Sequence, residues 1–102
     1  MITSKRNPLV RKLRCLQKKS GREEHSSLLL EGSHLLEEAL KTNFLPTEVI
    51  ATPEWCCEHE DVLRMMASRS LLTRVTQNVL EASLSTVTPD GVAAIFPMSG
   101  LP

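Results

Sequence analysis

Four short apolar runs divide the chain, and each is flanked by polar or turn-forming residues. Runs of this length, bounded in this way, are typical of buried β-strands. The longer stretches around them carry apolar residues at helical spacing, which predicts amphipathic helices. The strands are expected at 27–31, 47–51, 71–75 and 91–96, and the helices at 7–19, 33–41, 53–66 and 77–82. Because strands and helices alternate, the pattern predicts a layered α/β domain whose mostly parallel or mixed sheet is covered on both faces.

Several of the predicted helix ends carry capping residues. Asn7 is a good N-cap because its side-chain oxygen accepts a hydrogen bond from a backbone N–H one turn in, and Pro8 suits the first helical position. Ser33 is expected to cap the second helix in the same way. Ser20 and Gly21 are expected to end the first helix, because glycine commonly follows a last helical turn.

Length and cysteine content restrict the class of protein. The 102 residues are enough for one hydrophobic core. The sequence contains no apolar run of about eighteen residues and no signal-peptide pattern. Its three cysteines make no even disulfide framework. We therefore expect a protein of the cytoplasm, or of an organelle lumen, with no membrane partner.

Basic charge is concentrated at the N-terminal end of the chain. Residues 1–22 carry a charge of +8 and no acid, whereas residues 23–102 hold all 12 acids and only four basic residues, which leaves −8. The N-terminal basic residues are Lys5, Arg6, Arg11, Lys12, Arg14, Lys18, Lys19 and Arg22. A compact basic element on a mildly acidic body is the electrostatic pattern expected of a protein that contacts nucleic-acid phosphates.

Two alternatives to phosphate binding stay open for this basic segment. An amphipathic helix can carry lysines and arginines for solubility alone, and a basic helix can dock an acidic protein partner. Solvated helices ordinarily mix both signs of charge, because i, i+4 ion pairs support the helix. The absence of acids from this segment therefore favours phosphate binding over simple solubility.

The remaining chemically notable residues fit simpler roles. Cys56 and Cys57 precede a glutamate and a histidine, but neighbouring cysteines on a helix point about 100° apart and no second ligand pair follows. His25 is expected in the loop before the first strand, without a nucleophile motif beside it. Residues 89–91 are expected to form the turn that leads into the last strand. The sequence thus predicts no metal site and no catalytic residue in this chain.

Three groups of residues carry a resemblance to a known family. They are Ile2-Thr3-Ser4 with Asn7-Pro8-Leu9-Val10 and Lys12-Leu13, then Leu28-Leu29-Leu30-Glu31-Gly32 before a helix that ends in Glu38-Ala39-Leu40, and finally Thr86 with Thr88-Pro89-Asp90-Gly91-Val92-Ala93-Ala94. In this order and spacing they resemble the N-terminal substrate-binding domain of SpoU/TrmH-type RNA methyltransferases. The resemblance implies a three-layer α/β/α sandwich with a four-stranded mixed sheet, similar to the ribosomal proteins that bind kink-turn RNA.

The resemblance also implies a division of labour between two domains. In the family, the substrate-binding domain precedes a knotted catalytic domain that binds S-adenosylmethionine and methylates a ribose 2′-hydroxyl of tRNA or rRNA. The family's catalytic domain opens with a motif in which an Asn is followed by a Gly two residues on and by an Arg shortly after. Asn7, Asn43 and Asn78 have no such followers. We therefore expect residues 1–97 to form the RNA-binding domain and residues 98–102 to begin a linker. The chain itself is expected to bind no cofactor and to be non-catalytic, and the parent enzyme to be a homodimer. A stand-alone RNA-binding protein of ribosomal type is the alternative.

The predicted RNA contacts fall in two segments. The first segment contributes Lys5, Arg6, Asn7, Arg11, Lys12, Arg14, Lys18, Lys19 and Arg22, and the loop after the first strand contributes Gly32, Ser33 and His34. A helix N-terminus in that loop suits a phosphate, although a turn and a cap account for Gly32 and Ser33 equally well. Because Phe44, Trp55 and Phe96 are the only aromatic residues, we expect recognition by phosphate contacts and RNA shape rather than by base stacking.

Overall fold

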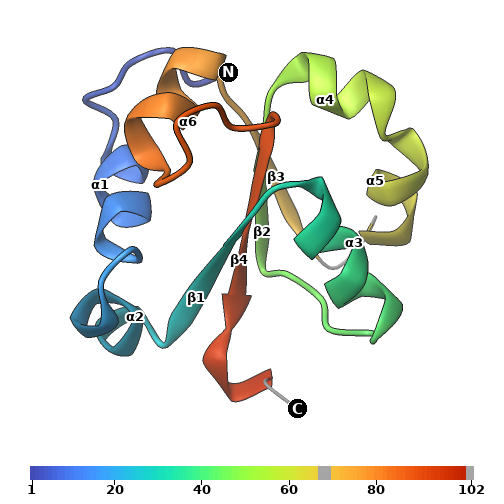
Figure 1. Ribbon diagram of the computed structural model, residues 1–102, viewed down its shortest axis with the longest axis horizontal. Helices are drawn as coiled ribbons and strands as arrows, with labels where there is room; N and C mark the ends of the chain where they lie inside the picture. The colour runs from blue at the N-terminus through green and yellow to red at the C-terminus, as the bar shows by residue number, and fades with distance from the viewer. Residues whose placement is uncertain (67–69, 101–102) are drawn as a thin grey trace.

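The computed structural model describes residues 1–66 and 70–100 (Figure 1). These residues form six α-helices, four strands and one 3-10 turn. In chain order they are α1 (Pro8–Cys15), α2 (Lys19–His25), β1 (Ser27–Glu31), α3 (Ser33–Lys41), β2 (Glu48–Ala51), α4 (Pro53–Glu58), α5 (Glu60–Met66), β3 (Leu71–Arg74), α6 (Gln77–Ser83), β4 (Val92–Pro97) and η1 (Met98–Gly100). None of the described helices is long and apolar enough to cross a membrane.

The four strands form one mixed sheet in the order β1-β4-β2-β3. The last strand, β4, lies between β1 and β2 and runs antiparallel to both, with Leu29 opposite Ile95 and Ile50 opposite Ala93. β2 and β3 are parallel. Because β4 is flanked by strands and covered on both faces, nearly all of its residues are buried, which explains its continuous apolar sequence. The predicted α/β architecture with a four-stranded mixed sheet is confirmed.

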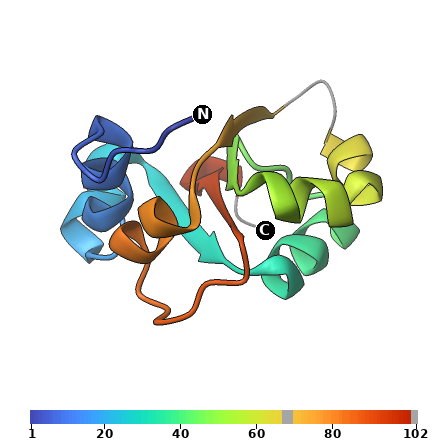
Figure 2. The same ribbon diagram turned by 90° about the horizontal axis from the view of Figure 1, so that it is seen from above.

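Helices cover both faces of this sheet (Figures 1 and 2). α1 and α6 lie against one face, and α3, α4 and α5 lie against the other. Alternate residues of β4 divide between the two cores: Ala93 and Ile95 face α1 and α6, while Val92, Ala94 and Phe96 face the opposite layer. The three layers predicted from the family resemblance are therefore present.

α1 is held to the sheet by its apolar face. Val10, Leu13 and Leu16 are at most 1% exposed and pack in one cluster with Val79 and Leu80 of α6. Each such side chain contributes about 1.5–3 kcal/mol of hydrophobic stabilisation. The opposite face of α1, which carries most of its basic residues, is consequently left to solvent.

The first helix is shorter than predicted, and a second helix follows it. α1 ends at Cys15, and Ser20 and Gly21, expected to stop the helix, lie inside α2. Gly21 is buried, and a Cβ atom at this position would lie 1.9 Å from the carbonyl oxygen of Cys15. The glycine is therefore required for the close approach of α2 to the end of α1, and its role as a helix stop was wrongly inferred. His25, expected in a loop, is the last residue of α2.

The helix predicted at 53–66 is divided in two at His59. The backbone of His59 leaves the helical region, with φ −130° and ψ 41°. Its ring stacks on Trp55 with ring centroids 4.4 Å apart, and its Nδ1 lies 2.9 Å from the Trp55 carbonyl oxygen. The break separates α4 from α5, and both helices contribute to the same core, α4 through Trp55 and α5 through Val62.

The predicted cap of α3 also differs from the observed one. Gly32 occupies the N-cap position with φ 102°, and Ser33 is the first helical residue. The carboxylate of Asp90, distant in sequence, accepts the Ser33 N–H at 2.9 Å. The Ser33 hydroxyl instead accepts a hydrogen bond of 2.7 Å from the Trp55 indole N–H. The cap of α3 is thus provided by Asp90, a residue distant in sequence, and not by the side chain of Ser33.

The structure describes the first three residues of the predicted linker, 98–100. β4 extends to Pro97, and Met98–Gly100 form the 3-10 turn η1, whose first N–H donates to the Ser26 carbonyl oxygen at 2.9 Å. Residues 101–102 lie outside the described residues. The boundary between a domain at 1–97 and a linker at 98–102 stays a prediction.

Candidate nucleic-acid interface

The basic side chains of the N-terminal segment are mounted on a well-anchored helix. Asn7 caps α1 as predicted, because its Oδ1 accepts the Leu9 N–H at 2.9 Å, and Pro8 occupies the first turn. Lys12 and Arg14 lie in the last turn of α1, where positive charge is favoured by the helix dipole. No acid is present in α1. The helix therefore holds its cations in a fixed arrangement rather than on a loose tail.

Most of these cations face solvent. Lys5 and Arg6 are exposed in the turn before α1, Arg11 and Arg14 are exposed on α1, Lys12 is partly buried and Lys18 is exposed just after the helix. We call this set, Lys5, Arg6, Arg11, Lys12, Arg14 and Lys18, the α1 basic surface. It meets the electrostatic requirement for contacts with a run of phosphates.

Three of the predicted basic residues have intramolecular partners. Arg14 Nε donates to the Ala82 carbonyl oxygen at 2.7 Å, which joins α1 to α6. Arg22 donates to the Leu16 carbonyl oxygen at 3.1 Å, and Lys19 forms an exposed ion pair of 3.9 Å with Glu23. Because α2 also carries acids, the positive charge is weaker there than on α1. Lys19 and Arg22 are therefore less available for RNA contacts than the basic residues of α1.

The second predicted segment lies at the start of α3, on the opposite side of the sheet from α1. Gly32 is partly buried, and both the N–H and the hydroxyl of Ser33 are hydrogen-bonded within the protein. His34 is exposed. The structure therefore does not bring Gly32, Ser33 and His34 into one patch with the α1 basic surface.

Glu31 links these two regions. Its carboxylate accepts hydrogen bonds from the backbone N–H and the hydroxyl of both Ser85 and Thr86, and from Gln17 between α1 and α2. Burial alone raises the pKa of Glu31, but the hydrogen bonds from Thr86, Ser85 and Gln17 outweigh it and lower the pKa from 4.5 to about 2. This role was not predicted, and its only local signal in the sequence is the density of Ser and Thr at residues 85–88.

A groove of about 500 Å³ opens where α4 and α6 begin. Its lining includes Thr52, Trp55 and Gln77 together with the acids Glu54, Glu58 and Asp90, and contains no lysine or arginine. Its acids disfavour a phosphate, and apart from the amino terminus of Met1 it offers no cationic group for the carboxylate of S-adenosylmethionine. The groove therefore lacks the basic side chains expected of a phosphate site.

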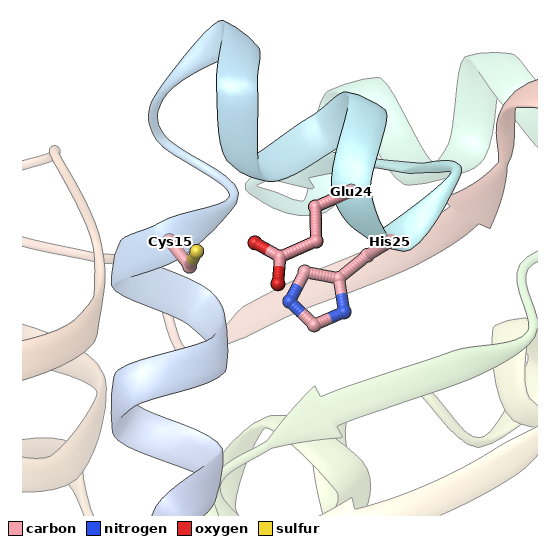
Figure 3. A group of neighbouring side chains, drawn as sticks. All are labelled: Cys15, Glu24 and His25. Carbon is pink, nitrogen blue, oxygen red and sulfur yellow. The ribbon is translucent and has the colours of Figure 1, made fainter.

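The three cysteines lie in different surroundings. Cys56 is buried, and this burial raises the pKa of its thiol, whereas the adjacent Cys57 is exposed. Cys15 is partly buried at the end of α1. The structure brings it close to Glu24 and His25 of α2, as Figure 3 shows. This cluster was not predicted, because the second helix was not expected.

The fold and the acid-free helix together define a three-layer α/β domain with a basic helical surface. Residues 7–94 match the family described as the MRM3-like substrate binding domain. The chain belongs to this family, the substrate-binding domains of SpoU/TrmH-type RNA 2′-O-methyltransferases.

Individual relatives agree with this assignment. The chain is 43% identical over 99 residues to an uncharacterized tRNA/rRNA methyltransferase of Synechocystis sp., a match that covers 95% of this chain and 36% of the relative. It superposes on the AdoMet-bound rRNA methyltransferase from Sinorhizobium meliloti with a TM-score of 0.78 and 27% identity, covering 94% of this chain and 35% of that one. A SpoU methyltransferase from Streptomyces viridochromogenes shares the fold, with a TM-score of 0.72 at 16% identity over 91% of this chain and 36% of that one. The chain spans about a third of the length of these relatives.

Proposed function

We propose that this chain holds an RNA substrate, tRNA or rRNA, for methylation of a ribose 2′-hydroxyl, and that the α1 basic surface makes the phosphate contacts. The observation that carries the proposal is the exposed, acid-free basic face of α1, anchored to the sheet by Val10, Leu13 and Leu16. A folded helix fixes the backbone positions of several cations, so that little backbone entropy is lost when the RNA backbone docks.

The mode of recognition follows from the placement of the aromatic residues. Trp55 and Phe96 are buried, and Phe44 packs on Phe96 with ring centroids 4.6 Å apart. These three are all the aromatic residues of the sequence. Bases therefore have no aromatic platform on this domain, and affinity depends on phosphate contacts and on the shape of the RNA.

The chemistry is assigned to another part of the enzyme. S-adenosylmethionine, when bound in the catalytic domain, supplies the methyl group, and the acidic groove at the start of α4 and α6 has no lysine or arginine to bind its carboxylate. In the proposed arrangement, residues 98–102 lead from this domain to a catalytic domain, and the parent enzyme works in the cytoplasm as a homodimer. The role of this chain is to bind and orient the RNA.

The proposal is tested by the salt dependence of RNA binding and by charge reversal. The 102-residue chain is titrated with a tRNA transcript and with an rRNA fragment at increasing salt. About four phosphate contacts give a log–log slope of roughly −3. The double variant Arg11→Glu with Lys18→Glu removes two exposed cations, which lowers affinity at low salt at least about tenfold and reduces the slope by about 2.

The matched control reverses Lys41 and Arg64, exposed cations in the helix layer on the other side of the sheet. It changes the net charge equally and is expected to preserve most of the affinity. A flat salt dependence, or equal losses from the two double variants, contradicts the assignment of the α1 basic surface. Thermal unfolding of each variant verifies that the fold is retained, because exposed charges change stability by about half a kcal/mol.

A further inference from the structure

Three potential metal ligands converge where α2 lies against the end of α1. The Sγ of Cys15, a carboxylate oxygen of Glu24 and a ring nitrogen of His25 all lie within 4.8 Å of one another. Figure 3 shows the three side chains directed into the same space, with Cys15 from α1 and the other two from the last turn of α2.

The backbone conformation before and after Glu24 and His25 holds the three ligand side chains close together. Gly21 allows α2 to lie against Cys15, because a side chain at residue 21 would also come within 2.9 Å of the Cys15 sulfur. After His25 the chain turns through Ser26 in the left-handed region, at φ 49° and ψ 41°, and enters β1. The three ligands are thus carried by helices whose relative position is set by close packing rather than by a free loop.

We propose that Cys15, Glu24 and His25 form a Zn²⁺ site. A thiolate, an imidazole and a carboxylate are the three side-chain ligand types that zinc takes, and three protein ligands leave a fourth position for water. The thiolate and the carboxylate together neutralise the two charges of the ion. The softness of the sulfur ligand favours zinc over Mg²⁺ or Ca²⁺, which take oxygen ligands.

The distances require only local adjustment. With metal–ligand bonds of about 2.0–2.3 Å, the ligand atoms of a tetrahedral zinc site lie roughly 3.3–3.8 Å apart. The distance between any two of the three ligand atoms therefore has to shorten by about 1.5 Å at most. Glu24 and His25 are exposed, so that their side chains can rotate without moving the core.

A comparison with Cys56 and Cys57 shows why this cluster differs. Those two cysteines are neighbours on α4 with short side chains, and one is buried while the other is exposed. Glu24 and His25 are also neighbours on a helix, but their longer side chains reach to a common point beside Cys15. The expected absence of a metal site was inferred without this contact between α1 and α2.

The test is metal binding by the tag-free chain, measured by competition between the protein and a chromophoric chelator for Zn²⁺. One ion per chain is expected. Cys15→Ser, Glu24→Gln and His25→Asn each remove one ligand, and each is expected to weaken binding by more than the roughly 10–100-fold loss typical of an altered outer-shell partner. With Co²⁺ as the probe, the wild-type chain gains a sulfur-to-cobalt charge-transfer band, which Cys15→Ser abolishes.

The control variant is Cys57→Ser, which removes the exposed thiol of α4 and is expected to leave both the stoichiometry and the cobalt band unchanged. His25→Asn alters an exposed residue, so that loss of binding in this variant with an unchanged circular dichroism spectrum is not a folding failure. Binding that survives all three ligand substitutions, binding lost only in Cys57→Ser, or absence of the cobalt band in the wild-type chain overturns the proposal.

Discussion

The carboxylate of Glu31 accepts two hydrogen bonds from Thr86, one of 2.7 Å from the hydroxyl and one of 3.1 Å from the backbone N–H. Ser85 donates to the other carboxylate oxygen in the same way. The end of β1 is thereby tied to the loop between α6 and β4. Glu31 and Thr86 belong to two of the three residue groups on which the family resemblance rests, so that these two groups are in direct contact in the fold.

Glu31→Gln is expected to lower the free energy of unfolding by about 2 kcal/mol. The amide is neutral and presents one acceptor oxygen in place of two, whereas hydrogen bonds to a charged group contribute about 1.5–3 kcal/mol. Urea unfolding monitored by circular dichroism measures the change. Glu38→Gln is the control, because its ion pair with Lys41 is exposed and its loss costs at most about 0.5 kcal/mol. Equal effects of the two substitutions contradict the role given to Glu31.

The stabilisation by Glu31 is expected to depend on pH in a defined direction. Its pKa is lowered from 4.5 to about 2 in the folded protein, so the unfolded chain binds the proton more readily. The contribution is therefore complete above pH 4.5 and is lost as the pH falls toward 2. Urea unfolding of the wild-type chain and of Glu31→Gln between about pH 6 and about pH 2.5 measures this. The difference in stability between them is expected to shrink across that range, and a constant difference excludes the ionised carboxylate as its source.

Gly21→Ala is expected to destabilise the protein, although alanine is the better helix former by about 1 kcal/mol. The added Cβ would lie 1.9 Å from the Cys15 carbonyl oxygen, so that α2 has to move away from α1. A net loss of at least about 2 kcal/mol is expected from this overpacking. Ser20→Ala, at an exposed position of the same helix, is expected to stabilise slightly. A stabilised Gly21→Ala variant would show that α2 does not contact Cys15 in this way.

Asp90→Ala is expected to cost about 1 kcal/mol, because it removes the acceptor of the Ser33 N–H and a negative charge at the N-terminus of α3. Ser33 and Leu36 amide protons are expected to exchange faster with solvent in this variant, which hydrogen exchange followed by NMR detects. Glu81→Ala changes an exposed acid on α6 and serves as the control. Unchanged exchange in α3 would mean that another group caps this helix.

Much of this protein is determined by local sequence. The strand at residues 27–31 has the predicted bounds, and the other three strands agree within one residue at each end, because short apolar runs between turn formers have few alternatives. Asn7 acts as the predicted cap because its hydrogen-bond partner is two residues away. The concentration of basic charge at residues 1–22 is likewise a property of the sequence alone.

Only the tertiary structure decided how distant residues pair. Ser33 has the sequence of a cap but hydrogen-bonds to Trp55, while Asp90 caps α3 from 57 positions away. Gly21 has the sequence of a helix stop but allows α2 to touch Cys15, which in turn brings Cys15, Glu24 and His25 together. These pairings depend on how β4 enters the sheet between β1 and β2 and on how closely two helices approach. Local propensity carries no information about either, because both are set by the packing of the whole core.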